Sequence, residues 1–149
     1  MILTIKVKAK VDWTGLKRSV HKMNIKNIGH AAALVRKFSA RSIRYRKNKH
    51  KASPVGTPPF THDSRVSPYR YAPLRKSIKY VVEKENELAV VGVSYSGLLD
   101  IGYAHEKGGW YKMKRAKTAM YYKKRPFMKP ALDNVSPSFP RLWEGSLRK

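Results

Sequence analysis

The sequence predicts a small α+β domain in which a small antiparallel β-sheet packs against a long N-terminal helix and a C-terminal helix, with a long proline-rich loop. Three observations lead to this prediction: a stretch of helical periodicity near the N-terminus, two apolar runs joined by a polar turn, and a proline-delimited apolar segment near the C-terminus. The 149 residues suffice for one hydrophobic core, so we expect a single domain over residues 1–149.

The N-terminal third is expected to contain a strand followed by helices. The start, MILTIKVKAKVDW, alternates apolar and polar residues, which predicts a strand. Asp12 or Thr14 can cap a short helix that reaches Met23. A longer helix is expected over residues 25–45, because apolar and small residues recur there at spacings of three and four. This face consists of Ile28, Ala32, Val35, Phe38 and Ser42, and the opposite face carries Lys26, Arg36, Lys37, Arg41 and Arg44.

The periodicity fails over residues 46–73, which hold five prolines and one glycine. A segment of this length without regular structure is typically functional or disordered until bound. Pro58-Pro59 favours extended polyproline geometry, and Gly56 before it can take a positive φ. We therefore expect an extended or mobile loop that projects from the body.

Two strands are expected next, over residues 74–82 and 88–95, and the polar run EKENE between them predicts a β-hairpin. In the second strand, Ala89-Val90-Val91 is an unbroken apolar run, which is typical of a strand covered on both faces. Residues 98–106 can be a short helix or turn, stopped by Gly108-Gly109. Residues 110–125 can be a strand pair or an ordered loop.

The C-terminal part contains the segment KKRPFMKPALD, which is shaped by two prolines. Pro126 argues against helix immediately before it, whereas Pro130 suits the first turn of a helix. The expected apolar face of that helix is Met128, Ala131, Leu132 and Val135. Pro137 and Pro140 should stop it, and a last short helix can contain Leu142, Trp143 and Leu147.

The charge is the most prominent feature of the composition, with 33 Lys plus Arg against 9 Asp plus Glu and a net charge of +24. Residues 36–51 and residues 107–125 each carry eight basic residues and no acid, while acids gather at Glu83, Glu85 and Glu87. Such an excess attracts nucleic acid or acidic protein surfaces. No apolar run approaches the roughly 18 residues of a membrane span, so no membrane partner is expected. The absence of cysteine excludes disulfides and thiolate metal sites and fits a cytosolic origin.

The sequence lacks the signatures of an enzyme. There is no Gly-x-Ser-x-Gly elbow and no phosphate-binding loop, and we expect no cofactor and no catalytic activity. A metal-dependent hydrolase would have to use His62, Asp63, His105 and Glu106, but adjacent side chains diverge and a metal needs three or four converging ligands.

Aromatic and basic residues interleave over residues 110–125, a mixture that combines base stacking with phosphate neutralisation. The alternative interpretation is that Tyr111, Tyr121 and Tyr122 pack against the core or a neighbouring subunit while the lysines stay solvated. The candidate contacts to DNA or to an acidic partner are Lys112, Lys114, Arg115, Lys117, Lys123, Lys124 and Arg125.

Four stretches, read in order, resemble the phage head–tail joining family, whose members are also called tail-completion, minor tail or virion-morphogenesis proteins. They are SPVGTPPFTH at 53–62, LRKSI at 74–78, GYAHEKGG at 102–109 and RPFMKPAL at 125–132. The resemblance spans residues 25–136, and its specificity comes from the order and spacing of the four motifs. The chain departs from the family pattern in a longer loop between Thr61 and Leu74 and in Pro137 and Pro140, which shorten the last helix.

The resemblance implies a non-enzymatic virion subunit, assembled in the cytoplasm of the bacterial host. Such subunits form a ring, expected to be hexameric, between the head connector and the tail tube, with DNA passing through the centre. A proline-rich loop can reach a neighbouring subunit. The candidate subunit contacts are Pro54, Val55, Gly56, Thr57, Pro58, Pro59, Phe60 and His62.

The net charge conflicts with a channel lined by all of these basic residues, because DNA that slides through a pore should not be held tightly. We expect much of the charge to face acidic partner proteins or the outer surface, with only non-specific contacts to DNA. Because self-repulsion opposes assembly, the isolated chain is expected to be monomeric. A basic nucleic-acid-binding protein of phage origin is the alternative function.

Overall fold

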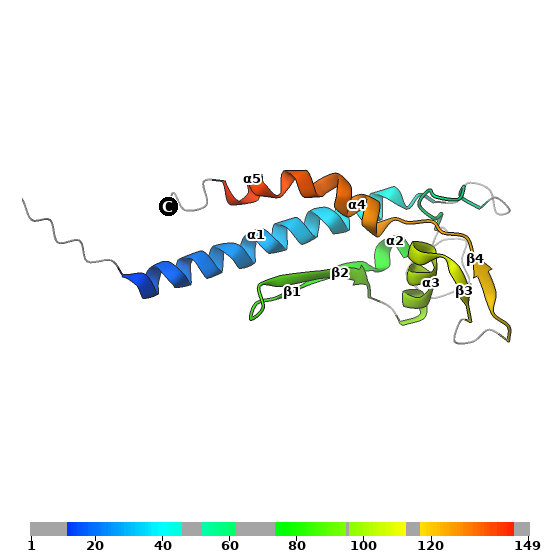
Figure 1. Ribbon diagram of the computed structural model, residues 1–149, viewed down its shortest axis with the longest axis horizontal. Coiled ribbons are helices and arrows are strands. Elements are labelled where there is room, and N and C mark those ends of the chain that lie inside the picture. The colour runs from blue at the N-terminus through cyan, green and yellow to red at the C-terminus, as the bar shows by residue number, and fades with distance from the viewer. Residues whose placement is uncertain (1–11, 46–51, 62–73, 95, 113–116, 145–149) are drawn as a thin grey trace, which may run out of the picture.

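The computed structural model describes residues 12–45, 52–61, 74–94, 96–112 and 117–144, and its fold is α+β (Figure 1). Apart from Asp12 and Trp13, the strand expected at the N-terminus lies outside these residues, as does Leu147. The elements in order are α1 (Trp13–Ser42), α2 (Leu74–Ser77), β1 (Ile78–Glu83), β2 (Leu88–Val93), α3 (Ser96–Lys107), β3 (Gly109–Tyr111), β4 (Met120–Tyr122), α4 (Met128–Val135), the 3-10 turn η1 (Ser136–Ser138) and α5 (Pro140–Trp143).

Helix α1 is one continuous helix of 30 residues, so the expected division near Met23 is wrong. Neither proline nor glycine stands at residues 23–25 to interrupt it. Asp12 is the N-cap, and its Oδ1 accepts a hydrogen bond of 2.9 Å from the Gly15 N–H. The expected apolar face is only partly buried: Ala32 and Val35 lie in the core, whereas Phe38 is 37% exposed.

Helix α1 forms the middle of the molecule. The β1–β2 hairpin packs along one side of it, and α4 and α5 pack along another (Figure 1). Beyond the helix end, Ile43 joins Leu74, Ile78 and Phe127 in the buried apolar cluster. The long helix therefore organises both the sheet and the C-terminal helices, as the fold class predicts.

The hairpin is confirmed, but its first strand begins later than expected because residues 74–77 form the helical turn α2. Leu74 and Ser77 are buried three residues apart, which is helical spacing, and the Ser77 hydroxyl donates to the Leu74 carbonyl at 2.7 Å. The two strands are antiparallel, with Val81 opposite Val90.

The expectation that β2 is covered on both faces is wrong for the described chain. Val81 and Val90 point away from α1 and are 69% and 61% exposed. The run Ala89-Val90-Val91 is continuous in the sequence, but successive strand residues face opposite sides, and α1 covers only one of them.

Residues 110–125 contain a strand pair, one of the two expected alternatives. Strands β3 and β4 form a second two-stranded antiparallel sheet, with Trp110 opposite Tyr121. At the C-terminus, Pro130 lies in the first turn of α4 as expected, and α4 ends at Val135, just before the Ser-Pro-Ser turn.

Candidate functional site

The four motifs, far apart in the sequence, meet around Phe127. This side chain is 1% exposed and packs with Leu74 and Ile78 of the second motif. In the third motif, a Cβ added to Gly102 would lie 2.8 Å from Val93 Cγ2 and 3.8 Å from Leu74 Cδ1, so α3 approaches β2 too closely for a side chain.

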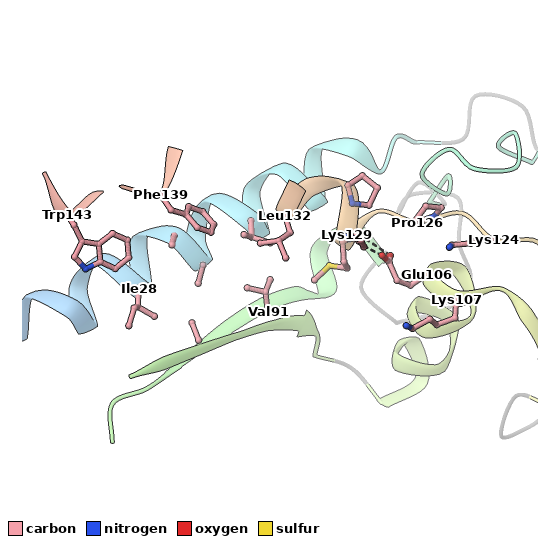
Figure 2. A pocket seen from close by; sticks show the side chains of 16 residues that line it. Ile28, Val91, Glu106, Lys107, Lys124, Pro126, Lys129, Leu132, Phe139 and Trp143 are labelled. Atoms are coloured by element: carbon pink, nitrogen blue, oxygen red, sulfur yellow. Dashed lines mark hydrogen bonds between the residues drawn. The ribbon is translucent and has the colours of Figure 1, made fainter. Parts of the chain in front are cut away.

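Glu106 of the third motif caps the helix that the fourth motif opens. Its carboxylate accepts the backbone N–H groups of Phe127, Met128 and Lys129 at 2.9, 3.0 and 2.9 Å. Figure 2 shows Glu106 beside Lys129. These N–H groups belong to the N-cap residue Phe127 and to the first two residues of α4, where no carbonyl of the helix can accept them. A negative charge there is also favoured by the helix dipole. Glu106 thereby ties the end of α3 to the start of α4.

The proline-rich motif is bonded to the same cluster of motifs around Phe127, which we call the hub, and its backbone makes these bonds. The Gly56 N–H donates to the Lys124 carbonyl at 2.9 Å, and Arg125 Nε donates to the Ser53 carbonyl at 2.9 Å. Ser53, Pro59 and Thr61 are buried. The described part of the segment, residues 52–61, therefore packs on the body, contrary to the expectation that the loop projects from it.

The candidate subunit contacts divide into an exposed and a packed part. Pro54 to Thr57 are exposed, with Val55 at 59%, and they form the outward turn of the motif. Pro58 and Phe60 are half-buried and Pro59 is buried, so these three hold the turn in place. His62 lies outside the described residues.

The basic segment between α3 and α4 is anchored at both ends on the last turn of α3. The Gly108 N–H donates to the Ala104 carbonyl at 2.8 Å, and the Arg125 N–H donates to the His105 carbonyl at 2.7 Å. Among the candidate basic contacts, Arg125 is half-buried and Lys114 and Arg115 lie outside the described residues. The exposed candidates are Lys112, Lys117, Lys123 and Lys124.

The tyrosines of this segment divide between the two interpretations. Tyr111 and Tyr122 are half-buried and pack edge to face with each other at a centroid distance of 6.2 Å. Tyr121 is 60% exposed and packs with Trp110, itself 72% exposed, at 5.6 Å. Sequence reasoning did not single out Trp110, although its spacing from Tyr111 already places the two on opposite faces of a strand.

The hypothetical metal residues do not come together in the described chain. His62 and Asp63 lie outside it, and Glu106 is engaged by three N–H groups. Burial, and then the nearby Arg125 charge, lower the pKa of His105, whose Nδ1 is buried without a partner among the described residues. No group of three or more potential metal ligands occurs in the described ranges.

A groove with a volume of about 750 Å³ lies between β2, α1 and the C-terminal helices (Figure 2). Its floor is α1, and its walls come from β2 and from α4 and α5. The apolar lining consists mainly of Ile28, Ala31, Ala32, Val35, Ala89, Val91, Leu132, Phe139 and Trp143, and Lys107, Lys124 and Lys129 lie at its rim. Sequence reasoning did not predict this groove, because its residues come from elements that meet only in the fold.

Beside this groove, a network of polar side chains joins the hairpin turn and α5 to α1. Asn24 of α1 donates to Glu87 in the hairpin at 3.2 Å and accepts from Trp143 Nε1 at 3.0 Å. Glu87 also contacts His21 at 2.6 Å, and the hydrogen bonds from His21 and Asn24 lower the pKa of Glu87. The hairpin and α5 are thus fixed to the same turns of α1.

Within the described chain, none of the helices has the length and hydropathy needed to cross a membrane. Comparison with protein-family models, with curated proteins and with solved structures found no match.

Proposed function

We propose that this protein is a structural subunit of a phage neck, which forms a ring, hexameric as in the family it resembles, between the head connector and the tail tube. The observation that carries the proposal is that the four resembling motifs form one hub. Each contributes a part that the others need: buried core residues, a close-approach glycine, a helix cap and a backbone-bonded turn. Because the four motifs contact one another in the fold, they support an architecture shared with the head–tail joining family more strongly than four unconnected resemblances would.

Two exposed apolar surfaces support a role in assembly. One is the outer face of the β1–β2 hairpin at Val81 and Val90, and the other is the Trp110–Tyr121 pair. Contiguous apolar groups exposed on a soluble chain are typical of surfaces that meet another protein. A ring subunit needs two such surfaces, because each copy contacts a neighbour on either side.

The charge distribution is compatible with a conduit that does not hold DNA tightly. Lys26, Lys37 and Arg41 are exposed on α1, and Arg44 is exposed just beyond its end. Only part of the +24 charge therefore belongs to the candidate segment between α3 and α4. In the proposed ring, the remainder faces acidic partner proteins or the outer surface.

The decisive experiment is a gene knockout in the phage, complemented with variants and examined by electron microscopy and by mass spectrometry of purified virions. We expect unjoined heads and tails without the protein, and rescue by the wild type. Val90→Asp, which charges the hairpin's outer face, should fail to rescue while the purified variant keeps its fold. Glu85→Gln is the control, because Glu85 is an exposed residue in the turn of the same hairpin. Normal virions from the knockout, or virions that lack the protein, would reject the proposal.

The Trp110–Tyr121 pair also favours a second candidate function, a basic nucleic-acid-binding protein. Both rings are exposed and lie near Lys112 and Lys123, as base stacking with phosphate contacts requires. A salt titration of DNA binding tests it with Trp110→Ala, since loss of one stacked base costs about 1–3 kcal/mol, or roughly 5- to 150-fold in affinity. Trp13→Ala is the matched control, because Trp13 is 66% exposed at the start of α1. Equal affinities of the two variants would argue against this function.

A further inference from the structure

Strand β2 has a free edge beside the groove in the described chain, where it pairs with β1 alone. The Ser94 N–H donates to the Ser77 carbonyl at 2.9 Å, just beyond the ends of the two strands. Bonded and non-bonded pairs alternate along an antiparallel ladder, so only every second residue of β2 bonds to β1. The residues in between, Ala89 and Val91, direct their N–H and carbonyl groups to the other edge, and their side chains line the groove.

The composition of β2 does not protect this edge. Free edges of natural sheets are commonly blunted by charged residues, by proline or by a bulge, which prevent pairing with another chain. Strand β2 has the sequence LAVVGV, without charge or proline, and its register with β1 is continuous. The outer edge of β1 is different, because the Ile78 carbonyl accepts a hydrogen bond of 3.0 Å from Arg36 Nε. The edge of β2 is therefore suited to pair with a further strand.

The groove runs along β2 from its start to its end. Asn24 joins Glu87, just before β2, to Trp143 through hydrogen bonds of 3.2 and 3.0 Å. At the other end of the strand, Val93 packs against the same core cluster as Met128, the first residue of α4. The lysines of the rim belong to this second end, because they lie at the end of α3 and around the start of α4.

This second end of the groove is positively charged. Lys107 and Lys124 are exposed, and Figure 2 shows their ammonium groups pointing toward the groove. Within the described ranges neither forms an ion pair, whereas Lys129 pairs with Asp133 at 3.0 Å. Glu106 lies at the same end, but its carboxylate is engaged by three N–H groups. The groove thus offers an apolar length followed by two cations that can meet carboxylates.

We propose that the groove binds an extended segment of an acidic partner protein, which pairs antiparallel with the free edge of β2. Every second side chain of the segment is apolar and lies against the lining at Ile28 and Leu132. Because the segment runs opposite to β2, its N-terminal end carries the carboxylates that meet Lys107 and Lys124. An acyl chain also suits an apolar groove, but it has no N–H or carbonyl groups for the edge of β2. The inference goes beyond the proposed neck subunit, since it assigns a partner to the groove and does not require a ring.

A synthetic peptide tests the pairing on the full chain, with a run of glutamates followed by alternating valine and threonine. Binding is measured by fluorescence anisotropy, and a peptide of the same composition in shuffled order controls for charge alone, because the +24 chain attracts any anion. We expect the ordered peptide to bind about tenfold more tightly or better, since only its valines all face the groove. No binding of the ordered peptide, or equal binding of the two peptides, would overturn the proposal.

Methylation of the peptide backbone tests the hydrogen bonds directly. In the antiparallel pairing the valine N–H groups face β2 and the threonine N–H groups face away. Methyl groups on the valine nitrogens should therefore weaken binding about tenfold or more, whereas those on the threonine nitrogens should leave it unchanged. An effect of the threonine methyl groups as large as that of the valine methyl groups would refute the pairing.

Amide exchange locates the peptide and identifies any other occupant. In the dilute free protein, the N–H of Val91 should exchange faster than that of Gly92, which bonds to β1, and bound peptide should slow only Val91. A Val91 N–H that is already protected in the dilute free protein would overturn the proposal, because the chain itself would then cover the edge. Protection that appears only at high protein concentration would overturn it in favour of a second copy.

The charged end is tested with two adjacent lysines. Lys124→Glu reverses a charge at the groove, and Lys123→Glu is the matched control, because Lys123 is exposed but does not line the groove. Both variants change the net charge equally, so a difference between them reports local contact. We expect Lys124→Glu to bind the ordered peptide about threefold more weakly than Lys123→Glu, or weaker still. Equal affinities would contradict the placement of the carboxylates, and with it the proposal.

Discussion

Replacement of Glu106 by glutamine isolates the cap that joins the third and fourth motifs. The carboxylate accepts three N–H groups through both of its oxygens, whereas the amide of glutamine keeps one acceptor and turns a donor toward the other N–H groups. The variant loses at least one charge-assisted hydrogen bond and the favourable charge at the start of α4. Capping losses of up to about 2 kcal/mol are typical, and we expect Glu106→Gln to lower the free energy of unfolding by about 2 kcal/mol.

For a chain of this length, that loss lowers the melting temperature by about 4–8 °C, which calorimetry or circular dichroism resolves easily. Glu85→Gln is the control, since it removes the same charge from the +24 chain at an exposed position of the hairpin turn. Amide exchange provides a local measurement, because the N–H groups of Phe127, Met128 and Lys129 should exchange faster only in the Glu106 variant. Equal melting temperatures and unchanged exchange in the two variants would refute the proposed cap.

Four further predictions concern the core, a turn, a half-buried histidine and the state of assembly. Phe127→Ala should cost about 3–5 kcal/mol in a denaturant titration, and Phe38→Ala, at a partly exposed position, much less. Gly108→Ala should cost about 1–3 kcal/mol in the same titration, because φ is +70° and the new Cβ would meet Lys124 backbone N at 3.0 Å; a loss below about 0.5 kcal/mol would contradict this. Since burial lowers the pKa of His105, the unfolded chain takes up a proton at this residue at a higher pH than the folded chain does. The free energy of unfolding should therefore fall as the pH drops below the ordinary histidine pKa of 6.5 and level off below the pKa of the folded state. This decline should be weaker in His105→Gln. Light scattering should find a monomer at low salt, and a stable ring there would disprove the effect of self-repulsion.

The sequence predicted those elements whose signals are local. The hairpin followed from its polar turn and the start of α4 from Pro130, and Asp12, the cap of α1, was one of the two expected candidates with Thr14. Each of these signals depends on a few adjacent residues. The helical turn α2 was missed because LRKS is too short for periodicity to distinguish helix from strand.

The site depended on contacts between distant segments, and there sequence reasoning was less complete. An apolar run at Val90 shows that a strand has apolar side chains on both faces, but not which face another element covers. The role of Glu106 was also hidden, because its acceptor geometry depends on N–H groups 21 to 23 residues later in the chain. The four motifs were visible in the sequence, but the contacts between them depend on the fold.

The anchoring of the basic segment at both ends has a consequence for how this protein can diversify. The N–H groups of Gly108 and Arg125 donate to the carbonyls of adjacent residues in the last turn of α3, so the chain between them leaves and rejoins the body at one place. Doubling the length of such an excursion adds only about 0.6 kcal/mol of closure entropy. A change in the length of this stretch should therefore cost little stability and leave the contacts of its two anchors intact.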